Sequence, residues 1–333
     1  MYNYNKIGQI ERPGGKRNLN IECLRVMMML LIVIMHLSGH SVDMDSVRSG
    51  GSIENYIILA YRSITYLGVP TFAFISGYYG ISFKFKKLIN MEIMAITYGV
   101  MVILFCILLH LHIKPSYYFY LLFPASSMFL WYYSSYVYLF LISPFINLSA
   151  EKLSKKDFEH ALIGLLIVGF VLRSQLFGQT NDFMLLLSIY LVGRYLKIYP
   201  IKFIQEKSFI LFISLQTLNI FVFILCSAMR QILLVKLWEG TNILTFSSAI
   251  CVFYIFLKKR NVSLVTKYTA ILGPYMLSVY ILHALILRCD VIDISSLNGK
   301  LLYILPISIL TLLVVSLIEK CRLKLMEKIE QTL

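Results

Sequence analysis

The sequence predicts an all-α integral membrane protein, a bundle of about ten transmembrane helices with cytosolic N- and C-termini. Three observations lead to this prediction. The 333 residues are 59% hydrophobic and only 14% charged, whereas soluble domains carry about 25% charged residues. Apolar runs long enough to cross a bilayer recur along the whole chain. The basic residues gather in every second connection between these runs.

Charged or turn residues bound each apolar run. The ten expected spans are 21–41, 57–80, 91–113, 119–146, 161–177, 183–199, 209–229, 241–257, 270–289 and 301–318. The fifth is the weakest, because it is short and is followed by Arg173 and Gly178. We expect a polar cytosolic lead-in at 1–18, a membrane domain at 19–320 and a cytosolic tail at 321–333.

The charge distribution gives the orientation. With a cytosolic N-terminus, 23 of the 31 Lys and Arg residues fall on the cytosolic side, at least three in every connection there. The net charge of +14 therefore reflects insertion into a lipid bilayer, and we expect no nucleic-acid partner. The six cysteines are scattered without a C-x-x-C pair, so neither a metal site nor a disulfide framework is expected.

The first helix carries ionisable residues that are costly inside a bilayer and are therefore functional candidates. Glu22 and Arg25 are three residues apart and can pair on one face. His36 follows Arg25 by eleven residues, which returns it to nearly the same face about 16 Å deeper. The structural alternatives are a snorkelling anchor for Arg25 and a helix-packing hydrogen bond for His36.

A second histidine, His283, follows Tyr280 in the ninth helix. Both helices run outward from the cytosol, and the two histidines lie at similar distances along them, about 13 and 15 residues in. Equal depth suggests that His36 and His283 share one cavity, although depth alone also allows coincidence. A neutral histidine can act as a base near pH 7.

The second helix ends in a stretch that contains Ser76 and Gly77, near the expected depth of Arg25. Gly and Pro in this stretch permit close helix approach. Lys84, Lys86 and Lys87 follow directly and could hold phosphates. The alternative is that these lysines only set the topology.

The fourth expected span contains a cluster of aromatic residues. Trp131 and Tyr132 lie toward its outer end, where they could stack on a sugar or belong to an interfacial aromatic belt.

Five of these segments, taken in order, resemble the membrane acyltransferase-3 family, which includes O-acetyltransferases of bacterial surface polysaccharides. They are the helix start at 20–25, Arg25-x10-His36, the stretch 68–77, the segment 131–147 with Pro144 and Asn147, and Tyr280-x-x-His283. The chain departs from the family where Glu22 and Pro70 stand, since many members have Asp there. Its lysines after the second helix replace a stretch that is often Arg-rich.

The resemblance implies an O-acetyltransferase of the bacterial cytoplasmic membrane that needs no bound cofactor. Cytosolic acyl-CoA, most often acetyl-CoA, would be the donor, bound by Arg25, Glu22, Ser76, Gly77, Lys84, Lys86 and Lys87. His36 would act as general base or would transiently accept the acyl group, and His283 and Tyr280 would orient it. A polysaccharide or its lipid-linked precursor would be the acceptor, against Trp131 and Tyr132. The competing classes are a transporter or flippase for a lipid-linked sugar and a membrane sensor.

Overall fold

The computed structural model describes residues 9–10, 17–111, 114–171, 182–259, 262–289 and 291–332, and within these residues the fold is helical. Two short strands, β1 (Gln9–Ile10) and β2 (Arg17–Asn18), pair antiparallel just before the first helix. Most of the predicted lead-in at 1–18 lies outside the described residues.

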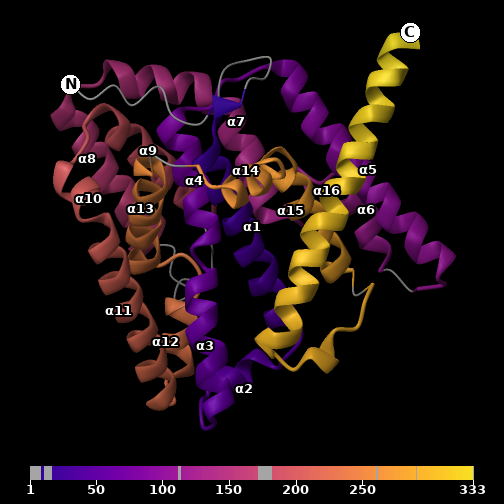
Figure 1. The fold of residues 1–333 in the computed structure, drawn as a ribbon, viewed down its shortest axis with the longest axis horizontal. Coiled ribbons are helices and arrows are strands. Elements are labelled where there is room, and N and C mark those ends of the chain that lie inside the picture. The colour runs from indigo at the N-terminus through magenta and orange to yellow at the C-terminus, as the bar shows by residue number, and fades with distance from the viewer. Residues whose placement is uncertain are drawn as a thin grey trace.

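The first helix, α1 (Leu19–His40), lies at the centre of the bundle (Figure 1). It begins where the Asn18 side chain accepts hydrogen bonds from the backbone N–H groups of Asn20 and Ile21. It contacts α3 (Ile53–Thr65), α4 (Gly68–Tyr79), α13 (Ile243–Lys258), α15 (Met276–Arg288) and α16 (Leu301–Thr332). Because α1 is surrounded by other helices, its polar residues Asn20, Glu22 and Ser38 are buried.

Seven of the ten predicted spans are confirmed as segments long and apolar enough to cross a membrane. Within the described residues these are Leu19–His40, Ile53–Tyr79, Phe85–Leu108, Ser208–Ala228, Ile232–Lys258, Leu264–Arg288 and Leu301–Lys328. The other three correspond to α7 (Trp131–Lys152), α8 (Lys155–Leu166) with the π-helical turn η1 (Ile167–Val171), and α9 (Asp182–Ile198). Part of the predicted span 161–177 lies outside the described residues. The chain is therefore a multi-pass membrane protein.

The predicted fourth span, 119–146, is wrong at its start. A short helix, α6 (Pro115–Leu122), ends there, and α7 begins only at Trp131. Pro124 explains the break, because proline has no N–H for the helix and disfavours helical geometry in the preceding residue.

Two further predicted spans are interrupted rather than continuous. The span 57–80 is divided between α3 and α4, just before Gly68 and Pro70. The span 270–289 is divided at Pro274, between α14 (Leu264–Ala270), the 3-10 turn η3 (Gly273–Tyr275) and α15. The break at Gly273 and Pro274 borders a cavity, whereas the break at Tyr66 and Leu67 is buried.

The remaining helices complete the two flanks of the bundle. In Figure 1, α8, α11 and α13 lie on one side of α1, and α5, α6 and α16 lie on the other, with α2 at one end. The elements whose bounds have not yet been given are α2 (Met44–Arg48), α5 (Phe85–Leu108), α10 (Lys202–Glu206), α11 (Ser208–Ala228), α12 (Ile232–Trp238) and the 3-10 turn η4 (Ser295–Leu297).

Close backbone packing joins α4 to α9. A Cβ atom on Gly77 would overlap the backbone carbonyl of Tyr190, and one on Gly193 would lie 2.7 Å from the carbonyl oxygen of Phe74. Small residues at such contacts allow membrane helices to approach closely. Gly77 therefore faces α9.

Candidate active site

Two histidines from distant parts of the chain meet in the bundle. His36 Nδ1 on α1 lies 2.8 Å from His283 Nε2 on α15, and their ring centroids are 5.1 Å apart. His283 is buried, with 3% of its surface exposed. The proximity expected from their equal depth is thus observed.

The hydrogen bonds of His283 determine which nitrogens of the pair carry protons. His283 Nδ1 lies 2.5 Å from the backbone carbonyl of Val279, one helical turn earlier. A carbonyl only accepts, so Nδ1 must donate, and Nε2 of a neutral His283 has a free lone pair. That lone pair accepts from the Nδ1–H of His36. In the neutral pair, Nε2 of His36 is therefore left unprotonated and able to take a proton.

Tyr280 connects the histidine pair to a large cavity. Its ring centroid lies 6.0 Å from that of His283 and 5.4 Å from that of Tyr132. Tyr132 in turn stacks edge-on with Trp131, at 5.7 Å. Because Tyr280 lines the cavity and also contacts His283, its ring links the cavity to the histidine pair.

This cavity, which we call the Arg25 cavity, has a volume of about 440 Å³. That volume lies within the usual range for small-molecule sites, about 300–1,000 Å³. Along α1 it extends from Arg25 to Ile32, one helical turn before His36. The polar residues that line it are Arg25, Ser76, Tyr79, Ser82, Lys87, Tyr132, Tyr136 and Tyr280.

A second opening begins along α1 where the Arg25 cavity ends. This Arg62 pocket has a volume of about 270 Å³ and is lined by Met35, His36, Gly39, His40 and Arg62. His36 thus lines the Arg62 pocket and not the Arg25 cavity. His283 does not line this pocket but borders another, of about 280 Å³, together with Asp293. The expectation that both imidazoles face one cavity is therefore not met, although they contact each other directly.

The acyltransferase domain of the acyltransferase-3 family matches residues 18–320. The chain belongs to the acyltransferase-3 family. It is a membrane acyltransferase, and the family match favours this class over a transporter. The chain matches no curated protein and no solved structure.

The structure brings together some of the donor-binding residues predicted for this acyltransferase and separates others. Arg25, Ser76 and Lys87 line one cavity. Lys84 and Lys86 are exposed and do not line it. The two lysines therefore lie outside the site that the other three residues form.

Glu22 and Gly77 also lie off the lining of the Arg25 cavity. Glu22 is buried and forms an ion pair with Arg25, with Oε1 2.9 Å from Nη1. An added Cβ on Gly273 would meet Glu22, so this glycine provides the space for the carboxylate. Glu22 holds Arg25 in place rather than facing the cavity, and Gly77 faces α9 instead.

Sequence reasoning missed Arg62. Arg62 is one of the eight Lys and Arg residues outside the cytosolic connections, but it is only 7% exposed and borders the same pocket as His36. A sequence signal existed: an arginine within an otherwise apolar span is a functional candidate. The segment 57–80 carries this single ionisable basic side chain.

Proposed function

We propose that this acyltransferase moves an acetyl group from acetyl-CoA to a hydroxyl of a cell-surface polysaccharide or of its lipid-linked precursor. The observation that carries the proposal is the contact between His36 and His283. His36 borders the Arg62 pocket, and the Tyr280 ring beside His283 lines the Arg25 cavity. Transfer from a cytosolic donor to an acceptor at the outer face needs a proton acceptor that both substrates can reach.

The donor occupies the Arg25 cavity in this proposal. Arg25 and Lys87 give its mouth two positive charges, which suit the phosphates of CoA. Tyr132 and Tyr280, at its inner wall, line an apolar path for the pantetheine arm. The Arg25 end of the bundle then faces the cytosol of a bacterial cell, with both termini on that side, in accordance with the distribution of basic residues.

The chemistry uses the unprotonated Nε2 of His36. It takes the proton of the acceptor hydroxyl as the oxygen attacks the thioester carbon, and the carbon–sulfur bond breaks. The proton passes from His36 to the leaving thiolate, so the products are the acetyl ester and free CoA. His283 Nε2 accepts the Nδ1–H of His36 throughout, which fixes the tautomer and the orientation of the ring.

The direct test is acetyl transfer by the purified protein in liposomes, with radiolabelled acetyl-CoA and oligosaccharides from the host surface. The wild-type protein should label the oligosaccharide, and His36→Ala should abolish labelling. His160→Ala is the matched control, because His160 is an exposed histidine on α8 and should label normally.

Two results would contradict the proposal. One is acetyl transfer that survives in His36→Ala. The other is an unlabelled glycan together with transport of a lipid-linked sugar across the liposome membrane, which would assign the protein to the flippase class. Comparing the ester content of surface polysaccharides with and without the gene tests the same proposal in the cell.

A further inference from the structure

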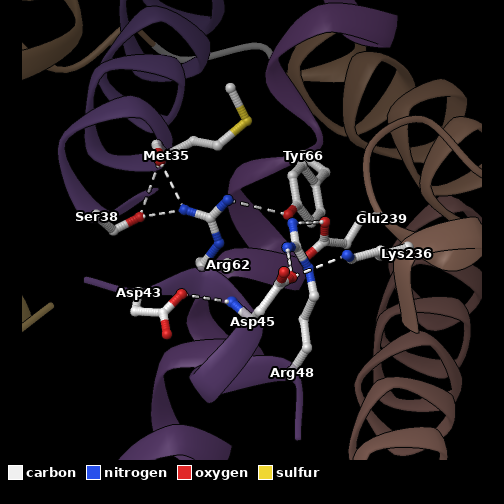
Figure 2. Close-up of polar contacts among 9 residues, drawn as sticks. All are labelled: Met35, Ser38, Asp43, Asp45, Arg48, Arg62, Tyr66, Lys236 and Glu239. Carbon is white, nitrogen blue, oxygen red and sulfur yellow. Dashed lines mark hydrogen bonds and ion pairs between the residues drawn. The ribbon is translucent and has the colours of Figure 1, made fainter. Parts of the chain in front are cut away.

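Two arginines lie close together near the end of α1, and their surroundings differ (Figure 2). Arg48 is neutralised by carboxylates: its guanidinium lies 2.6 Å from Glu239 and 2.7 Å from Asp45. Among the described residues, Arg62 donates hydrogen bonds only to neutral oxygens. It donates to the Met35 carbonyl at 2.8 Å, to Ser38 Oγ at 2.6 Å and, more weakly, to Tyr66 at 3.2 Å.

The charge of Arg62 has no anionic partner in the part of the chain that the structure describes. Its Nε is buried and has no hydrogen-bond acceptor there. Of its five N–H groups, three are used in the contacts above, which leaves Nε–H and one Nη2–H. A buried charge without a counter-charge is unfavourable, and buried charges in proteins are normally paired.

The position of Arg62 relates this charge to the reaction. The carbonyl of Met35, to which Arg62 donates, belongs to the peptide bond that precedes His36. Both side chains line the Arg62 pocket, and none of its described lining residues is acidic. Gly39 makes this approach possible, because a Cβ there would lie 3.0 Å from Arg62 Nη1. The pocket is thus lined both by an arginine without an anionic partner among the described residues and by His36.

We propose that Arg62 binds an anionic group of the acceptor, a carboxylate or a phosphate, and so directs a neighbouring hydroxyl toward His36. This inference rests on the proposed function and adds that the acceptor is an acidic glycan. A uronic acid would supply a carboxylate, and a phosphodiester-linked or lipid-linked sugar would supply a phosphate. Both oxyanions suit a guanidinium that has N–H donors to spare.

The test compares three oligosaccharide acceptors of equal length, one neutral, one with a glucuronic acid unit and one with a sugar phosphate. With the full-length protein in liposomes, kcat/KM should be about tenfold or more higher for an acidic acceptor than for the neutral one, as expected for a charge-assisted hydrogen bond. Arg62→Gln should reduce this ratio to near one. Arg62→Lys should retain part of it, because the charge remains. The acidic acceptor that loses more in Arg62→Gln identifies the anion.

Arg48→Gln is the matched control, because it removes a positive charge from the same end of the bundle but from a compensated site. It should leave the acidic-to-neutral ratio as in the wild type. Equal kcat/KM for all three acceptors, or an unchanged ratio in Arg62→Gln, would overturn the inference while acetyl transfer itself stands.

A binding measurement separates this inference from the proposed function. Affinity of the glucuronic acid oligosaccharide for the purified protein, measured without acetyl-CoA, should fall in Arg62→Gln and not in Arg48→Gln. If that holds but no acceptor is acetylated, the acidic site stands and the transfer reaction is wrong. If Arg62→Gln binds the oligosaccharide as tightly as the wild type, the acidic site is wrong.

Discussion

The two openings that follow each other along α1, the Arg25 cavity and the Arg62 pocket, differ in size and in how their arginines are compensated. Arg25 borders about 440 Å³ and is paired with Glu22. Arg62 borders about 270 Å³ and has only neutral partners among the described residues. A long cavity with a held arginine suits a large donor, whereas a small pocket with an unmatched charge suits one acidic group. For the proposed reaction, this difference predicts separate entrances for the donor and the acceptor.

The largest expected effect concerns the histidine pair. His36→Ala should lower kcat for transfer by about 10²–10⁴, the usual contribution of a general base. His283→Ala should lower it less, because His283 orients His36 through one hydrogen bond. The double variant should be no slower than His36→Ala alone, since residues that act as a unit are not additive.

Rates measured at equal amounts of inserted protein check this prediction. If His283→Ala proved slower than His36→Ala, the roles assigned to the two rings would be reversed.

The next effect concerns the larger opening. Arg25→Ala should raise the KM for acyl-CoA by about tenfold, as expected for the loss of a charge-assisted hydrogen bond to phosphate. Arg25→Lys should restore only part of the affinity, because a lysine cannot form the bidentate contact. Donor binding by calorimetry or initial rates would measure both.

Arg322→Ala is a close control for this variant. Arg322 pairs with Glu319 at the same i,i+3 spacing, 2.7 Å apart, but does not line the Arg25 cavity. A KM for acyl-CoA that rises equally in Arg322→Ala would show that the effect of Arg25→Ala is structural.

A smaller effect is expected on thermal stability, and it distinguishes a packing role of Gly77 from a role in donor binding. Gly77→Ala would place a methyl group against the backbone of α9, and such overpacking destabilises by about 1–3 kcal/mol. Gly164→Ala, on α8, enters open space and should be neutral or slightly stabilising. Thermal unfolding in detergent should therefore separate the two, and an unchanged midpoint for Gly77→Ala would argue against tight packing there.

The smallest effect concerns the compensated arginine, Arg48. Hydrogen bonds from Lys236 and Arg48 hold the pKa of Asp45 below its usual value of 3.8. A carboxyl with a depressed folded pKa contributes stability above its unfolded pKa, and this is lost as pH falls through the folded value. Stability should therefore fall slightly below pH 3.8 in the wild type and less so in Asp45→Asn. Parallel acid curves for the two would contradict the ion-pair account.

Equal depth in the membrane was enough to predict that His36 meets His283. This prediction succeeds because helix geometry fixes the rise per residue. Lengths and apolar composition likewise gave seven of the spans. Such properties depend only on one segment of the chain and on its distance from the membrane surface, so they can be worked out from the sequence.

The parts that could not be predicted depend on contacts between helices. Nothing near Gly77 in the sequence indicates that it packs on Tyr190, because the partner is more than a hundred residues away. The break at Pro124 was hidden by continuous hydrophobicity on both sides. Arg62 is 27 residues from Met35 in the sequence, and only the fold brings it to the Met35 carbonyl.

The most direct test of the two-entrance account is two-substrate kinetics on Arg25→Ala and Arg62→Gln, measured side by side with acetyl-CoA and the preferred acidic acceptor. The account predicts a raised KM for acetyl-CoA in Arg25→Ala alone and a raised KM for the acceptor in Arg62→Gln alone. If both variants raised the KM of the same substrate, the two openings would serve one ligand, and the separate entrances would be contradicted.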